Sequence, residues 1–136
     1  MKFRYPFLVL YFALAVQTGL AQNTYVPDNN FEQALIDLGY DDTLDDYVLT
    51  ANISSVTSLD VENQEISDLK GIEGFTALTF LKCDDNQLIS LDVSNNTLLT
   101  HLVCNDNQLT SLDVSANTAL TAVSYTHLTL PTNREV

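Results

Sequence analysis

Two adjacent segments of this chain, residues 78–98 and residues 99–119, carry nearly the same sequence. They agree at 15 of 21 aligned positions and share the letters L-T-x-L-x-C-x-D-N-Q-L-x-S-L-D-V-S-x-N-T. A fixed period of about 20–29 residues predicts a chain that winds into stacked coils, each of which contacts its neighbours. A single coil cannot bury its own apolar side, so this repeat constrains the fold more than any other feature.

The spacing of the apolar residues identifies the type of repeat. Positions 1, 4, 6 and 11 of the first segment carry Leu78, Leu81, Cys83 and Leu88, and position 9 carries Asn86. The second segment has the same residue types there, which fits the pattern L-x-x-L-x-L-x-x-N-x-L of a leucine-rich repeat. Alternation around positions 3 to 7 predicts a short strand whose positions 4 and 6 face inward. We therefore expect a leucine-rich repeat solenoid built on short parallel strands.

Two inward-facing residue types are expected to form structural ladders along the stack. Asn86 and Asn107 follow the strands, where a buried side-chain amide can bond the unpaired backbone groups of a bend. Cys83 and Cys104 lie one repeat apart and are expected to act as small buried hydrophobes with free thiols. Parallel side chains keep the Cβ atoms beyond the usual ~3.8 Å of a disulfide, although oxidation stays an alternative in an exported protein.

The first 21 residues have the features of a secretory signal. Lys2 and Arg4 form a basic start, residues 7–16 are apolar and uncharged, and Gly19 and Ala21 are small residues ahead of a cut before Gln22. The apolar run is shorter than the roughly 20 residues that a membrane span needs. We therefore expect cleavage, a secreted or cell-surface location, and no membrane span in the mature chain.

Residues 22–52 are predicted to form an N-terminal cap with a short helix. Asp28 or a neighbouring asparagine supplies the helix N-cap, and Gly39 supplies a stop. The apolar residues between them recur at helical spacing: Phe31, Ala34, Leu35 and Leu38. A helix here would cover the apolar edge of the first coil, as a terminal repeat requires.

Residues 53–123 are predicted to hold the repeats, at 56–77, 78–98 and 99–119, with a partial repeat at 120–123. Residues 124–136 then leave the pattern. Their string S-Y-T-H-L-T-L-P-T looks like a translated sequencing adapter, so we expect a tail that is a sequencing or assembly artefact on a truncated fragment. The alternative is a genuine capping strand.

The charge of the chain excludes one class of partner. Residues 22–123 contain 17 Asp and Glu against 2 Lys, a net charge of −15. Nucleic acid needs a basic footprint, whereas this charge favours cationic or divalent partners. A calcium alternative rests on four clustered carboxylates: Asp41, Asp42, Asp45 and Asp46. They lack the Asp-x-Asp-x-Asp-Gly spacing of an ordered calcium loop, so a solvated acidic turn and no metal site are expected.

The chemistry-bearing residues do not predict an enzyme. The order Ser-His-Asp and a glycine-rich phosphate loop are not visible, and the repeated Asp92 and Asp113 are better explained as a turn ladder than as an acid–base pair. Cys83 and Cys104 lack the partner ligands of a zinc site. We therefore expect no catalytic activity and no cofactor.

The outward strand positions are where a solenoid generally binds. In sequence order they are Ser58, Asp60, Glu62, Phe80, Lys82, Asp84, His101, Val103 and Asn105. The predicted binding residues are the last six of these. Phe80, His101 and Val103 would form a modest apolar and aromatic patch, which on a surface can mark a contact site.

A resemblance can be stated on two stretches of sequence. Residues 26–48 read V-P-D-N-N-F-E-Q-A-L-I-D-L-G-Y-D-D-T-L-D-D-Y-V, and residues 59–78 read L-D-V-E-N-Q-E-I-S-D-L-K-G-I-E-G-F-T-A-L. Together with the repeats they resemble secreted leucine-rich repeat proteins of Bacteroidota, broadly internalin-like.

The resemblance implies a right-handed solenoid with strands on its concave side and an irregular convex side. It also implies an extracellular role in binding or adhesion. The predicted function is a secreted or cell-surface module that binds a protein or glycan through its concave face. The alternative is a structural spacer or stalk in a larger surface protein.

Overall fold

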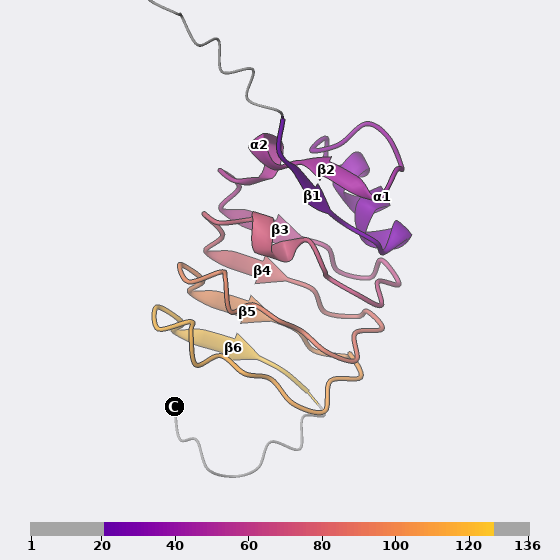
Figure 1. Cartoon of the computed structure of the whole chain (residues 1–136). Coiled ribbons are helices and arrows are strands. Elements are labelled where there is room, and N and C mark those ends of the chain that lie inside the picture. The colour runs from indigo at the N-terminus through magenta and orange to yellow at the C-terminus, as the bar shows by residue number, and fades with distance from the viewer. Residues whose placement is uncertain (1–20, 127–136) are drawn as a thin grey trace, which may run out of the picture.

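The structure is a computed structural model that describes residues 21–126. Four parallel strands, one for each successive coil, form its main sheet in the order β3-β4-β5-β6. Their bounds are Ser58–Asp60 (β3), Phe80–Lys82 (β4), His101–Val103 (β5) and Ala122–Ser124 (β6). Figure 1 shows these strands stacked from the N-terminal cap downward, with long irregular connections between them. The predicted leucine-rich repeat solenoid is confirmed.

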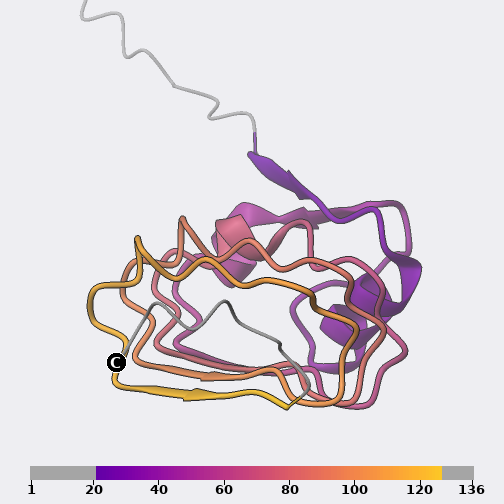
Figure 2. The ribbon, with the colours of Figure 1, turned by 90° about the horizontal axis from the view of Figure 1, so that it is seen from below.

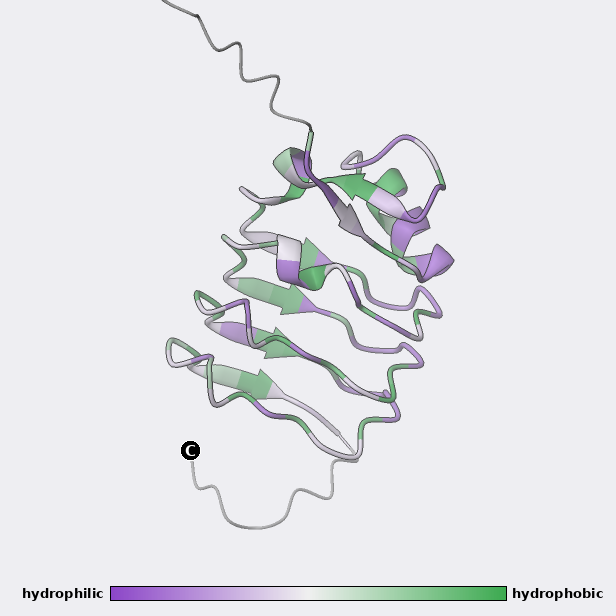
Figure 3. Ribbon diagram, viewed as in Figure 1, coloured by the Kyte–Doolittle hydropathy of each residue, from purple (hydrophilic) through white to green (hydrophobic). Residues whose placement is uncertain are grey.

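The core runs along the stack because each coil sends the same positions inward. Leu59, Leu81 and Leu102 are register partners on β3, β4 and β5, and each is at most 1% exposed. Figure 2 shows the coils superimposed when they are viewed along the stack, and Figure 3 shows hydrophobic segments recurring in successive strands. Stacking therefore joins the apolar sides of several coils into one hydrophobic core.

The N-terminal helix α1 spans Asn29–Asp37 and is capped by Asp28. One carboxylate oxygen of Asp28 accepts the backbone N–H groups of Asn30 and Phe31, both at 3.0 Å. Its other oxygen accepts the N–H groups of Ser67 and Asp68, at 2.9 and 3.0 Å. A single side chain thus caps the helix and fastens it to the first coil.

The helix buries the apolar face that its spacing predicted, with one exception. Phe31, Ala34 and Leu35 are buried, and the Phe31 ring lies 6.5 Å from that of Phe75, centroid to centroid. Leu38 is instead 46% exposed. Leu38 is the C-cap residue and its N–H still bonds to the carbonyl of Ala34, so this exposed side chain lies at the very end of the helix, past its buried face.

The cap and the first coil also contain elements without a local sequence signal. Strands β1 and β2 of the cap pair antiparallel, the short helix α2 follows them, and the short helix η1 lies in the first coil. The bounds are Asn23–Tyr25 (β1), Tyr47–Leu49 (β2), Thr50–Ile53 (α2) and Ile72–Gly74 (η1). Gly71 precedes η1 with φ = 108°, and a Cβ atom there would lie 2.7 Å from Cγ2 of Val26. The cap and the first coil therefore meet closely at a residue that has to be glycine.

The last described coil extends past the predicted end of the repeats. Ser124 belongs to β6 and pairs with Val103, and the Thr126 hydroxyl accepts the N–H of Asp106 at 3.2 Å. The proposed artefactual tail otherwise falls on residues 127–136, which lie outside the described residues, as do residues 1–20 of the signal predicted at residues 1–21.

Candidate binding surface

The outward side chains of the main sheet form one surface, here called the strand face. It consists of Ser58, Asp60, Glu62, Phe80, Lys82, Asp84, His101, Val103 and Asn105. The parallel register places Ser58, Phe80 and His101 in one row, and Asp60, Lys82 and Val103 in the next. Glu62, Asp84 and Asn105 follow the ends of these strands, so the structure brings all six predicted binding residues to one face.

An aromatic pair stands at the beginning of the strands. Phe80 and His101 are register partners, with ring centroids 6.3 Å apart and ring planes tilted by 39°. The Thr100 hydroxyl lies 2.9 Å from Nδ1 of His101 and orients that ring. Val103, half-buried on the same strand as His101, adds aliphatic surface beside the pair. These side chains form the apolar part of the strand face.

Lys82 is on the strand face but does not offer a free positive charge. Its ammonium group pairs with the Glu62 carboxylate and lies 3.9 Å from a carboxylate oxygen of Asp60. The hydrogen bond to Glu62 raises the pKa of Lys82, and the charges of Asp60, Glu62 and Asp84 act in the same direction against desolvation. The positive charge of Lys82, which the sequence placed in the binding surface, is therefore already paired with neighbouring acidic side chains.

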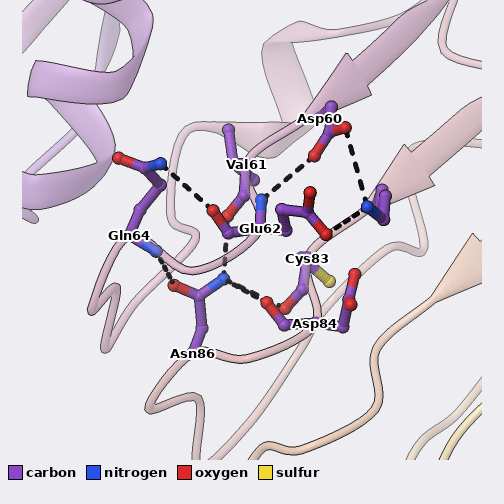
Figure 4. Close-up of polar contacts among 8 residues, drawn as sticks. Asp60, Val61, Glu62, Gln64, Cys83, Asp84 and Asn86 are labelled. Carbon is purple, nitrogen blue, oxygen red and sulfur yellow. Dashed lines mark hydrogen bonds and ion pairs between the residues drawn. The ribbon is translucent and has the colours of Figure 1, made fainter.

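Asp84 has an unusual carboxylate on this surface. Within residues 21–126, its Oδ1 atom is buried and has no hydrogen-bond partner. Its backbone carbonyl accepts the N–H of Asn63 and the side-chain amide of Asn86, both at 3.1 Å. Figure 4 shows Asp60, Glu62 and Asp84 gathered on neighbouring coils. A buried acceptor without a donor is costly, so this oxygen lowers the stability that the contacts of Asp84 otherwise give.

The structure gives Asn86 the hydrogen bonds that the repeat pattern predicts. Its Oδ1 accepts the N–H groups of Gln64 and Ile66 in the preceding coil, at 3.1 and 2.9 Å. Its Nδ2 donates to the carbonyls of Val61 and Cys83, at 2.8 and 3.1 Å, among others (Figure 4). The Asn86 amide therefore joins two coils immediately after their strands and fixes the rows of the strand face.

Asn107 repeats this role one coil later. Its Oδ1 accepts the N–H of Leu88 at 3.0 Å, and its Nδ2 donates to the carbonyl of Cys83 at 2.9 Å. The coil that Asn107 contacts is the one that contains Asn86, so the two side chains form consecutive steps of one ladder.

The two cysteines are buried and carry free thiols. Burial raises the pKa of Cys83 well above its ordinary value and raises the pKa of Cys104 to about 11. The Cys104 thiol donates to the carbonyl of Ser124 at 3.7 Å. A protonated thiol is a poor nucleophile and a poor metal ligand, so this pair acts as packing and not as chemistry.

A second asparagine ladder lies on the side of the coils away from the strands. Asn96 and Asn117 are 0% and 3% exposed. Asn96 donates to the carbonyls of Ile72 and Phe75, at 2.9 and 3.1 Å, and Asn117 donates to those of Val93 and Asn96, at 2.8 and 2.9 Å. The shared letters N-T of the repeat carried this signal, but no role was assigned to them from the sequence.

The acidic turn of the cap is organised by a buried carboxylate that sequence reasoning missed. Glu32 is 0% exposed, and its Oε1 accepts the N–H groups of Asp45 and Tyr47, at 2.8 and 3.1 Å. The signal available from sequence was its place on the inward side of α1, next to Phe31. Glu32 thus holds the turn against the helix from inside.

The calcium alternative is not supported by this turn. Asp41, Asp42 and Asp45 direct carboxylate oxygens to donors within the turn itself, at 2.9–3.1 Å. Asp46 instead adopts a left-handed backbone conformation, with φ = 69°. In the part of the chain that the structure describes, no group of three or more Asp, Glu, His or Cys side chains could hold a metal ion.

Comparison with known proteins agrees with this geometry. No protein-family model matches the chain. Internalin J of Listeria monocytogenes is 38% identical over 75 residues, which is 55% of this chain and 8% of that protein. The solved functional domain of that internalin, described as including a cysteine ladder, has a TM-score of 0.66 at 36% identity over 79% of this chain. The chain has an internalin-like leucine-rich repeat fold.

Two further solved internalins of the same organism support the fold. InlF has a TM-score of 0.67 at 25% identity over 73% of this chain, and internalin C2 has a TM-score of 0.67 at 23% identity over 76%. The chain spans 26%, 30% and 49% of the three solved structures. In this chain, Cys83 and Cys104 are buried free cysteines on consecutive coils. Within residues 21–126, no helix has the length and apolarity needed to cross a membrane.

Proposed function

We propose that this chain is a secreted or cell-surface binding module whose strand face contacts a protein or a glycan. The proposal rests chiefly on where the two matching repeats differ. Three of their six differences fall at the outward strand positions, where Phe80, Lys82 and Asp84 become His101, Val103 and Asn105. The inward leucines and cysteines, and the ladder asparagines, are the same in both repeats.

The differences are not explained by exposure alone. Ser90 and Ser111 occupy matching positions of the two repeats and are exposed, yet the residue is the same. The same holds for Asp92 and Asp113, two positions further on. Diversity concentrated on the strand face, with a uniform interior, is typical of a scaffold that presents a recognition surface. An aromatic and aliphatic patch among polar residues also suits a contact site.

The arrangement of the coils leaves this surface accessible. In Figure 2 the elements α2 and η1 lie across the coils from the strands, and α1 lies at the N-terminal end in Figure 1. A ligand could therefore approach β4 and β5 without displacing a helix of the described chain. The predicted signal segment supports a ligand outside the cell.

Binding to arrays of proteins and glycans tests the proposal. A combined Phe80→Ala, His101→Ala and Val103→Ala variant should lose the ligands that the parent chain binds. A matched control changes three exposed residues that lie outside the strand face: Thr97→Ala, Leu98→Ala and Thr118→Ala. The control should keep its ligands, and equal retention by both variants would contradict the proposal.

The spacer alternative makes the opposite prediction. A spacer separates domains without recognising a ligand, so the parent chain should then show no saturable binding on either array. A saturable ligand that is lost with the strand-face variant decides for the binding module.

A further inference from the structure

The strand face has an excess of negative charge close to its apolar patch. Three carboxylates, Asp60, Glu62 and Asp84, surround the single ammonium of Lys82, which leaves a net charge of −2. The side chains of Asp60 and Glu62 remain 54% and 45% exposed despite this pairing. Their remaining oxygen lone pairs are available to donors from outside.

We infer that the strand face binds a basic polypeptide segment, whose cationic side chains meet Asp60, Glu62 and Asp84 while an apolar side chain rests on Phe80 and His101. This inference rests on the proposed function and names its partner class. The aromatic pair of Phe80 and His101 supports it independently of net charge, because an aliphatic or guanidinium group can stack on the Phe80 ring.

The spacing of the surface suits an extended segment. Phe80 and Lys82 are alternate residues of β4, so the step between their outward side chains is about 6.6 Å, and Asp84 follows two residues after Lys82. An extended partner has the same repeat and can place alternating side chains on the aromatic row and the acidic end. Arginine suits both contacts, because its guanidinium stacks on aromatic rings and pairs with carboxylates in a fork geometry.

Charge beyond the contact area favours the same partner. Asp85 and Asp106 are exposed just past the strands, and the whole chain has a formal net charge of −13. A field of this sign speeds the approach of a basic partner and opposes an acidic one. A sulfated or otherwise anionic glycan would bring like charges together at Glu62 and Asp84, which is costly.

Three matched synthetic peptides test the inference on the full chain. They alternate leucine with arginine, with glutamine or with glutamate, so that length and apolar content are constant. Calorimetric titration should show binding of the arginine–leucine peptide alone, and its affinity should fall as sodium chloride is raised. Failure of the parent chain to bind that peptide, or equal binding of all three peptides, overturns the inference.

Two isosteric variants separate the strand face from net charge. The first removes the acids of the strand face: Asp60→Asn, Glu62→Gln and Asp84→Asn. The second removes three acids of the cap: Asp37→Asn, Asp42→Asn and Asp46→Asn. The first variant should bind the arginine–leucine peptide with an affinity lower by about tenfold or more, and the second with an affinity lower by about twofold or less. Equal losses would mean that net charge alone attracts the peptide, and the inference would fail.

Failure of this inference remains distinguishable from failure of the proposed function. If the array ligand depends on Phe80 and His101 but the basic peptide does not bind, the strand face still recognises a ligand and only the partner class is wrong. If the array ligand is indifferent to those two residues, the proposed function itself fails.

Discussion

The side-chain amide of Asn96 donates a hydrogen bond to the backbone carbonyl of Phe75 in the preceding coil, at 3.1 Å. The two residues are also structural counterparts. The N–H of Leu78 bonds to the carbonyl of Phe75, and the N–H of Leu99 bonds to that of Asn96, both at 3.1 Å. Phe75 therefore ends the second asparagine ladder, because its ring packs against Phe31 of the cap where a further asparagine would have no coil to contact.

This ladder gives the first prediction. Asn96→Ala should lower the free energy of unfolding by about 1–3 kcal/mol, because it removes a buried amide that donates hydrogen bonds to the carbonyls of Ile72 and Phe75 in the preceding coil. Urea denaturation measures the loss. The neighbouring exposed residue supplies the control, since Asn95→Ala should change stability by less than about 0.5 kcal/mol. Equal effects at both positions would count against the ladder.

Substitution in the Asn86–Asn107 ladder beside the strands should lower the stability at least as much. Asn86→Ala removes the acceptor of Gln64 and Ile66 and the donor to Val61, so it should also cost about 1–3 kcal/mol or more. Gln87→Ala, at an exposed position, is the matched control. Thermal melts of the two variants give the comparison, and an unchanged midpoint for Asn86→Ala would mean that the repeat register is wrong.

The sequence predicted the repeating part of the fold well because its signal is periodic. Leu81 and Leu102 recur at one spacing, and each repetition supports the same assignment of the inward side. The Asp28 cap was also local, since an N-cap and the helix it starts lie within a few residues. The strand face followed directly, because alternation along a strand assigns its outward positions.

Other features depended on contacts that a single sequence does not display. The pairing of Tyr25 with Tyr47 joins two three-residue strands across the whole of α1, and neither strand is long enough to show a period. Glu32 is a charged residue beside an acidic run, and such residues are almost never fully buried unless paired. The engagement of Lys82 by Glu62 required knowledge of which coils are adjacent and in what register.

Glu32 gives a prediction for the cap. Glu32→Ala should cost about 1–3 kcal/mol, because the N–H of Asp45 loses its acceptor, the N–H of Tyr47 keeps only the Asp45 carboxylate, and the acidic turn is released. Limited proteolysis should then cut within residues 41–46 first. Gln33→Ala, at the exposed neighbouring helix position, should leave both stability and the cleavage pattern almost unchanged. Unaltered proteolysis of the Glu32 variant would contradict this role.

The buried thiols predict a loss of stability in alkali. Burial raises the pKa of Cys104 from 9.0 to about 11, so the unfolded chain loses its thiol proton at lower pH than the folded chain does. The stabilising effect is complete below pH 9.0 and is lost progressively as the pH rises toward about 11. Urea denaturation at about pH 8 and about pH 10 should show the fall, and Cys104→Ala should reduce the difference between the two pH values.

The redox state of the thiols supplies the control for that experiment. Alkylation of the unfolded chain without reductant should modify both Cys83 and Cys104, because both thiols are free. A pH dependence that is identical in the parent chain and in Cys104→Ala would contradict the assignment. Resistance of the unfolded chain to alkylation would show that the pair is oxidised instead.

The strand face is proposed to contact a ligand, and an NMR titration can locate that contact. The ligand selected on the protein and glycan arrays is added to the isotopically labelled chain, and chemical shifts are followed residue by residue. The largest shifts are expected at Phe80, Lys82, His101 and Val103, with little change outside the strand face at Thr97 and Leu98. Shifts confined to residues outside the strand face, with β4 and β5 unaffected, would rule out this contact.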